Sequence, residues 1–130
     1  MDRIVLVGHV LPVVVAVTEE EQACGLMNRG WPPPAMAFPY DEPKIRKFWM
    51  KNTPSPLDLV FCRGGEVISI VEGHPFSLDL IGPDEPSDLV VELPRNTSQK
   101  MGIVEGSPVK LVYSLLTLAR RYELKLAKKS

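Results

Sequence analysis

The sequence carries almost no net charge, has few cysteines and lacks a long unbroken apolar segment. Its 15 Lys and Arg residues against 16 Asp and Glu residues give a formal net charge of -1 at pH 7. Such a chain has no overall electrostatic attraction for nucleic acid or for an anionic membrane. We therefore expect no nucleic-acid partner and no membrane partner, and instead an unknown small ligand or protein.

The two cysteines, Cys24 and Cys62, are too few for a disulfide scaffold and do not form a C-x-x-C pair. We expect both to be reduced and at least partly buried, because free cysteine behaves as a small apolar residue. The sequence alone does not exclude a disulfide between Cys24 and Cys62.

Motifs that mark familiar catalytic and metal sites are also missing. There is no phosphate-binding loop, no nucleophile elbow, no HExxH segment and no zinc-ligand spacing. Three methionines, Met27, Met36 and Met50, would suit Cu(I) if they converged, but methionine is an ordinary core filler. We therefore predict no metal and no cofactor.

The most apolar stretch, IVLVGHVLPVVVAV at residues 4–17, is interrupted by Gly8, His9 and Pro12. It is too short to span a membrane, Asp2 precedes it, and no small-x-small cleavage site follows. We interpret its first part as two short strands around a Gly8–His9 turn, and residues 13–17 as a strand buried on both faces. We therefore expect a cytoplasmic or otherwise unexported protein.

Proline is the residue in excess, with 13 in 130 residues, about twice the usual ~5%. Prolines are excluded from helix interiors and central strands, so they delimit many short elements. Gly64–Gly65 predicts a hairpin turn between two alternating runs. Thr18 and Glu21 predict a capping box that opens a short helix. Residues 35–38 and 44–51 are further candidate strands.

The chain length favours one domain. We predict an α+β, mostly-β fold, as a small barrel or a strongly curved antiparallel sheet with short helices and a C-terminal helix. Residues 1–113 would form a single mostly-β domain, and residues 114–130 a helical extension of it. The predicted helix should bury one of two apolar stripes, Leu115, Leu118 and Tyr122 or else Leu116 and Ala119. The surplus apolar surface suggests a homo-oligomer formed through this helix.

The segment FWMKNTPSPLD, Phe48–Asp58, is the most unusual part of the chain. Thr53 and Ser55 each precede a proline, which favours extended backbone at both residues. Asn52 can close a local turn through its own side chain. We therefore predict a stiff corner between two strands, here called the corner segment.

Several motifs carry a family resemblance: GLM at Gly25–Met27, FWMKNT at Phe48–Thr53, PLD at Pro56–Asp58 and VELP at Val91–Pro94. In this order and spacing they resemble the uncharacterised bacterial and archaeal domain-of-unknown-function family 192, over about Ile4 to Val112. The resemblance implies a small, mostly-β fold with short helices, and it implies no established activity. Many members look exported, whereas this chain lacks a convincing signal.

The sequence departs from the family pattern at three positions. Gln22 stands where the family usually has Arg, Ala35 where it tends to have Gly, and Arg63 where an aspartate is common in the hairpin turn. If the first two of these family residues serve a site in relatives, that site is altered here.

Asp58 is the most informative polar residue, because a buried carboxylate is costly unless it is paired or hydrogen-bonded. In one interpretation it accepts hydrogen bonds from the backbone or from Asn52 and Thr53 and locks the corner. In another it is a general base or a ligand anchor beside Lys51. In a third it is simply solvated at an edge. Glu92, which also lies in an apolar strand, could face the same pocket.

Trp49 either packs at the core or its rim, or forms with Lys51 the lip of a ligand cleft. Our leading hypothesis is a non-catalytic small-ligand or partner-binding module, with a cleft near the corner segment that uses Trp49, Lys51, Asn52 and Asp58. One alternative is a small hydrolase-like enzyme with Asp58 as general base. Another is a structural or assembly protein that uses the C-terminal helix. We lean against an enzyme.

Overall fold

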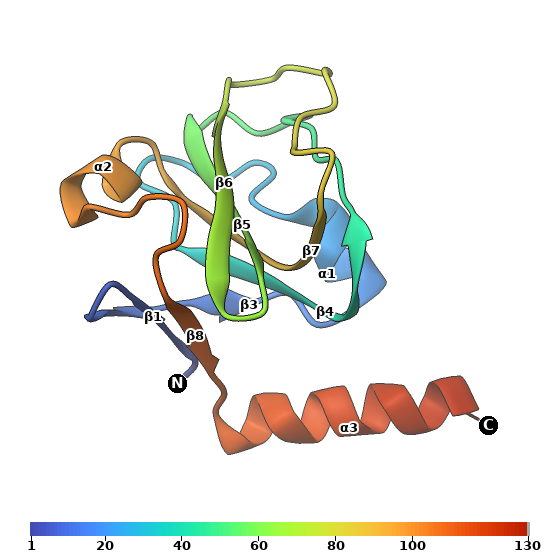
Figure 1. Ribbon diagram of the computed structural model, residues 1–130. Coiled ribbons are helices and arrows are strands. Elements are labelled where there is room, and N and C mark those ends of the chain that lie inside the picture. The colour runs from blue at the N-terminus through green and yellow to red at the C-terminus, as the bar shows by residue number, and fades with distance from the viewer. Residues whose placement is uncertain (130) are drawn as a thin grey trace.

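The computed structural model describes residues 1–129 as two open β-sheets packed face to face, with three helices around them (Figure 1). The larger sheet has the strand order β3-β4-β7-β5-β6. Its strands are β3 (Val14–Val15), β4 (Met36–Ile45), β5 (Leu57–Arg63), β6 (Glu66–Gly73) and β7 (Pro86–Pro94). All of its neighbours pair antiparallel except β3 and β4, which are parallel.

The smaller sheet has the order β2-β1-β8 and joins the two ends of the chain. Its strands are β1 (Arg3–Leu6), β2 (His9–Pro12) and β8 (Val109–Val112). The helices are α1 (Glu19–Cys24), α2 (Thr97–Met101) and α3 (Leu115–Lys129). The predicted mostly-β fold with short helices and a C-terminal helix is confirmed, in its curved-sheet form, because neither sheet closes into a barrel.

The larger sheet is buried on both faces, and its two faces contribute to two separate core clusters. Strand β5 divides its side chains between them by strict alternation. Val60 and Cys62 pack toward the smaller sheet, whereas Leu59 and Phe61 pack on the opposite face in one cluster with Leu26 and Met50. This explains why β5 is apolar on both sides, as expected for a strand covered on both faces.

One strand prediction is confirmed and two need correction. The predicted Gly64–Gly65 hairpin is present as β5–β6, with positive φ at both glycines. The strand predicted over residues 13–17 is reduced to β3, and Val14 is 42% exposed, so this strand is not buried on both faces. Residues 44–51 are not one strand: β4 extends to Ile45, and Phe48 forms an isolated bridge with Ile81.

Helix α1 begins with the predicted capping box. The Thr18 Oγ1 accepts a hydrogen bond from the Glu21 amide at 3.0 Å, and Glu21 Oε1 accepts from the Thr18 amide at 3.0 Å. Gly25 ends the helix with a φ of 51°.

Both cysteines are free, and Cys24 at the end of α1 is exposed rather than partly buried.

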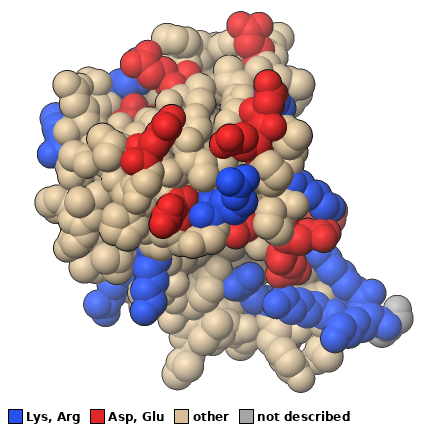
Figure 2. All heavy atoms as spheres, in the orientation of Figure 1, with Lys and Arg blue, Asp and Glu red and all other residues tan. Residues whose placement is uncertain are grey.

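Helix α3 contacts the rest of the protein through its polar and basic residues. Arg120 pairs with Glu21 at 2.9 Å, and Arg121 pairs with Asp41 at 3.7 Å. Figure 2 shows the Lys and Arg side chains along the body-facing side of this helix and uncharged side chains projecting from the outer side. At the start of α3, the Ser114 amide and the Thr117 hydroxyl donate hydrogen bonds to the Asp2 carboxylate.

The expectation that α3 buries an apolar stripe is wrong for this chain. Leu115 is 85% exposed and Tyr122 64% exposed, and Leu116, Leu118 and Ala119 are exposed as well. Helical spacing predicts which residues share a face, but the face turned inward is the one that carries Thr117, Arg120 and Arg121, which contact Asp2, Glu21 and Asp41. Residue 130, the last of the predicted extension, lies outside the described residues. No helix within residues 1–129 is both long and apolar enough to cross a membrane.

Candidate functional site

A cleft of about 550 Å³ opens on the face of the larger sheet that α1 covers. Its walls come from α1 and the turn after it, from β4, and from residues 45–49, and its floor includes Glu92 of β7. Parts of the chain from α1, β4, the corner segment and β7 therefore form one concave surface. We call this the Glu92 cleft.

Glu92 lies on the central strand β7, opposite Met36 of β4 and Leu59 of β5. Its side chain points into the apolar layer beneath α1 and is only 4% exposed. Within residues 1–129 no donor forms a hydrogen bond or ion pair with its carboxylate. Burial raises the pKa of Glu92 from 4.5 to about 7, because a charged group loses its hydration in an apolar setting.

Gly25 allows the end of α1 to lie directly over this carboxylate. A Cβ at this position would lie 3.6 Å from Glu92 Oε1 and 3.5 Å from the Phe38 ring, and the φ of 51° disfavours any residue with a side chain. The glycine of the GLM motif thus lies at the cleft, between the capped helix and the buried acid.

Tyr40 and Arg46 form one wall of the Glu92 cleft. Burial raises the pKa of Tyr40 to about 12, and the nearby Glu92 carboxylate acts in the same direction. The Arg46 guanidinium lies 3.4 Å from the centre of the Tyr40 ring. Its Nε donates to the Ser87 carbonyl at 3.0 Å and its Nη2 to the Glu42 carbonyl at 2.8 Å. Arg46 is therefore held in place by neighbours other than Glu92.

The opposite wall is aromatic. Phe48 packs edge-to-face between Phe38, at 5.3 Å between ring centres, and Phe61, at 5.8 Å. Trp49 follows and is 43% exposed, so its ring forms part of the cleft mouth. Lys51 Nζ lies 5.1 Å from the centre of the Trp49 ring. The structure thus places two of the predicted site residues together at the rim.

The corner segment is fastened to the turn that follows α1. The Asn52 carbonyl accepts from the Asn28 amide at 2.8 Å, and the Ser55 hydroxyl donates to the Arg29 carbonyl at 3.1 Å. Asn52 itself is exposed, with a φ of 55°. These bonds fix the rim that carries Trp49 against the wall that carries Gly25.

Asp58 lies on the other face of the sheet, away from the remaining predicted site residues. Its Oδ2 accepts hydrogen bonds from the Ser98 amide at 3.0 Å and the Ser98 hydroxyl at 2.7 Å, and Arg95 Nε lies 3.8 Å from Oδ1. Asn52 and Thr53 are not among these donors. Asp58 therefore fastens β5 to α2, and it lines neither this cleft nor the next.

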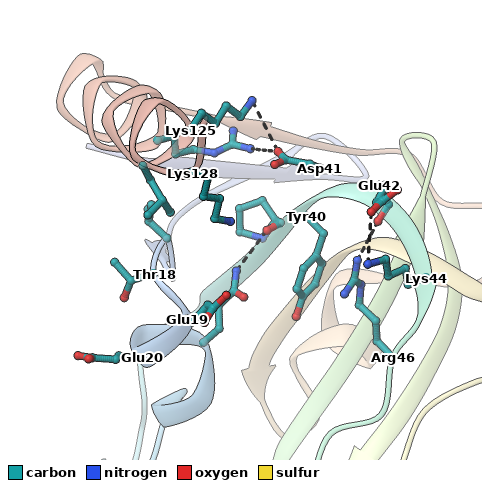
Figure 3. Close-up of a pocket in the computed structure, with 15 residues that line it drawn as sticks. Thr18, Glu19, Glu20, Tyr40, Asp41, Glu42, Lys44, Arg46, Lys125 and Lys128 are labelled. Carbon is teal, nitrogen blue, oxygen red and sulfur yellow. Dashed lines mark hydrogen bonds and ion pairs between the residues drawn. The ribbon is translucent and has the colours of Figure 1, made fainter. Parts of the chain in front are cut away.

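A second cavity, of about 790 Å³, lies between α1, β4 and α3 (Figure 3). Charged residues of both signs line it, and several are already paired, as Lys125 with Asp41 at 3.6 Å and Lys44 with Glu42 at 3.3 Å. Tyr40, Gln22 and Arg46 line both cavities. Gln22 donates to the Ala16 and Pro39 carbonyls at 3.2 and 3.3 Å, which fixes α1 against β4.

Glu92 lines the cleft but is not among the four site residues predicted from the sequence. The available signal was its position in LVVEL, because a strand apolar on both sides must be covered on both faces and its acid must then be buried. Tyr40 and Arg46 gave no such signal, since their stacking depends on tertiary contacts. Within residues 1–129 no group of three His, Cys, Asp or Glu side chains is arranged to hold a metal ion.

Comparison with known proteins gives one family model and two solved structures. The model of family DUF192, described as "Uncharacterized ACR", matches residues 4–111. A solved protein of unknown function from Novosphingobium aromaticivorans is 29% identical, with 83% of each chain covered and a TM-score of 0.77. A protein from Sinorhizobium meliloti, named as a candidate transcription regulator, is 31% identical, with 85% of this chain and 91% of that chain covered and a TM-score of 0.76. No curated protein matches the chain.

Proposed function

The chain belongs to the DUF192 family of uncharacterized proteins, and we propose that it is a non-catalytic module that binds a small organic molecule in the Glu92 cleft. The observation that carries this proposal is the Glu92 carboxylate, buried without a partner among residues 1–129 on the floor of an open cleft. An unpaired buried acid is costly for folding, so it favours a functional role.

The dimensions and lining of the cleft support the same proposal. Ligand pockets typically have volumes of roughly 300–1,000 Å³, mostly apolar walls and a few convergent polar groups. The Glu92 cleft, at about 550 Å³, combines aromatic walls with Glu92, Tyr40 and Gln22. The rival role of Asp58 as general base is less favoured, because its carboxylate is occupied by Ser98 and lines neither cavity.

Cys24 allows a direct test, because it is exposed and lines the cleft, whereas Cys62 is buried and burial raises the pKa of its thiol to about 12. We expect a library of small disulfide-bearing fragments to label Cys24 selectively, with a few members enriched by reversible binding in the cleft. Mass spectrometry of the equilibrated mixture measures this enrichment. Trp49→Ala should reduce it, because the ring forms part of the mouth.

The matched control carries Cys24→Ser together with Lys110→Cys, which moves the reactive thiol to an exposed position on β8. Fragments selected by the cleft should label this control only at the background level. If the same fragments label both thiols equally, and Trp49→Ala changes nothing, the proposed binding role is wrong.

The exposed face of α3 favours a second role, self-association. Leu115, Leu118 and Tyr122 form one stripe on the side of α3 away from Glu21 and Asp41. A second copy of the chain presents the same stripe, and a two-fold axis would bring the two stripes together as a self-complementary surface. We therefore propose a homodimer that buries this face.

Sedimentation velocity tests the dimer. The full chain should sediment as a dimer, and a chain ending at Tyr113 as a monomer. Tyr122→Glu should also give a monomer, because it places a charge in the middle of the apolar contact. Gln99→Glu adds the same charge at an exposed position on α2 and should leave the dimer intact. A monomeric full chain would refute self-association through α3.

A further inference from the structure

We infer that the ligand of the Glu92 cleft is an organic cation, whose protonated amine pairs with the buried carboxylate while its apolar part packs against the aromatic walls. This inference rests on the proposed binding function and specifies the chemistry of the ligand. Three features of the cleft support a cationic ligand. The cationic side chains around the cleft already have partners, the Glu92 carboxylate has none among residues 1–129, and aromatic rings surround it.

The cationic side chains around the cleft are already engaged. Lys47 Nζ contacts the Gly82 carbonyl at 2.6 Å and the Asp84 carboxylate at 2.8 Å. Arg46 is held by the Ser87 and Glu42 carbonyls and stacks on Tyr40. Among residues 1–129, neither these cations nor any other makes an ion pair with Glu92. The unmet charge in the cleft is therefore negative.

A cation is the partner that satisfies a buried carboxylate most completely. A close ammonium group donates a charge-assisted hydrogen bond to the buried carboxylate, and this attraction offsets part of the free energy that the carboxylate lost with its hydration. A ligand carboxylate would instead be repelled by Glu92 at short range. Arg46 could attract such an anion at the rim, but its guanidinium is directed to Tyr40 and to two backbone carbonyls.

The aromatic walls suit the rest of such a ligand. Phe38, Phe48, Tyr40 and Trp49 surround the path from the mouth to Glu92. Aromatic rings attract cations through their π faces, and the rings of this cleft already do so with Arg46 and Lys51. Trp49 is the exposed ring of the group, so its free surface can pack against an apolar or aromatic ligand group.

The inference predicts the sign of the pH dependence. Glu92 becomes ionised as the pH rises through about 7, whereas an alkylamine stays protonated to a pKa of roughly 10. A cationic ligand should therefore bind more tightly as the pH rises from about 6 to about 8. A neutral ligand that accepts a hydrogen bond from protonated Glu92 should instead bind less tightly as the pH rises over the same range. The other titratable or charged groups that face the cleft are Tyr40, Arg46, Lys47 and Cys24.

The experiment compares phenethylamine with two probes of similar shape, phenethyl alcohol and phenylacetate. Each is titrated into ¹⁵N-labelled wild-type protein kept reduced by a phosphine, and the amide resonances of Gly25 and Glu92 and the indole resonance of Trp49 are followed. Near pH 8 we expect phenethylamine to bind at least about tenfold more tightly than either probe. Its dissociation constant should fall by about tenfold between about pH 6 and about pH 8.

Glu92→Gln removes the charge while keeping the shape, and should abolish both the amine preference and its pH dependence. Glu105→Gln removes one negative charge from an exposed position after α2 and should keep both. If the alcohol or phenylacetate binds in the cleft as tightly as the amine, the inference of a cationic ligand is wrong while the binding function survives. If none of the three probes shifts the cleft resonances, both are wrong.

Discussion

Raising the pH from about 5 to about 8 should remove roughly 3 kcal/mol from the free energy of unfolding, because Glu92 has to lose its proton inside the fold. Its pKa is about 7 in the folded protein and 4.5 when unperturbed. Below both values the acid is protonated in both states and contributes nothing. Between them the unfolded chain releases the proton first, so the unfolded state gains stability with rising pH.

Urea denaturation at a series of pH values measures this effect. Glu92→Gln should flatten the curve, so that the variant exceeds the wild type in stability by about 1–3 kcal/mol near pH 8, after allowing for its own buried amide. The difference between the two proteins isolates Glu92 from the two exposed histidines, His9 and His74. Parallel stability curves for the two proteins would show that Glu92 is not buried as described.

Asp58→Ala should lower the free energy of unfolding by about 3 kcal/mol. The substitution leaves the Ser98 amide and hydroxyl without their buried acceptor. It also removes the carboxylate beside Arg95, which retains its bonds to the Leu57 and Gly73 carbonyls and its pair with Glu72. The substitution therefore weakens the attachment of α2 to β5, because this attachment runs through Ser98 and Asp58.

Ser98→Ala is the matched control, because it removes one of the two hydrogen bonds and should cost about 1 kcal/mol. In the double variant the two losses should be less than additive, since they share that bond. Asp58→Ala should leave fragment labelling at Cys24 unchanged, because Asp58 lies on the other face of the sheet from the Glu92 cleft. An unfolding midpoint equal to that of the wild type would contradict the structural role of Asp58.

Local signals in the sequence predicted local structure well. The capping box of Thr18 and Glu21 and the Gly64–Gly65 turn both depend on residues close in sequence, and both are present in the fold. The motifs of the family resemblance led to the correct family and fold class. For the capping box and the turn the decisive contact lies within a few residues, so the chain specifies it without knowledge of the tertiary packing.

The composition of the cleft could not be derived in the same way. Alternation shows that Asp58 and Glu92 are interior positions of apolar strands, but which face each one takes depends on the pairing Leu59↔Glu92 and Asp58↔Leu93. That register turns the two acids to opposite faces of the sheet. Likewise, the spacing of α3 defines its stripes, but which stripe faces inward depends on contacts with Asp2, Glu21 and Asp41. Both outcomes depend on contacts between distant parts of the chain.

The pairing of β1 with β8 has a consequence for how the protein is made. Arg3 pairs with Val112 and Leu6 with Val109, so the smaller sheet joins residues more than a hundred positions apart. On a ribosome β1 is synthesised well before β8, and until β8 is available it can pair with β2. Contacts of such high sequence separation form slowly. We therefore expect the larger sheet to assemble during synthesis and the smaller sheet to close over its face only after β8 has been released.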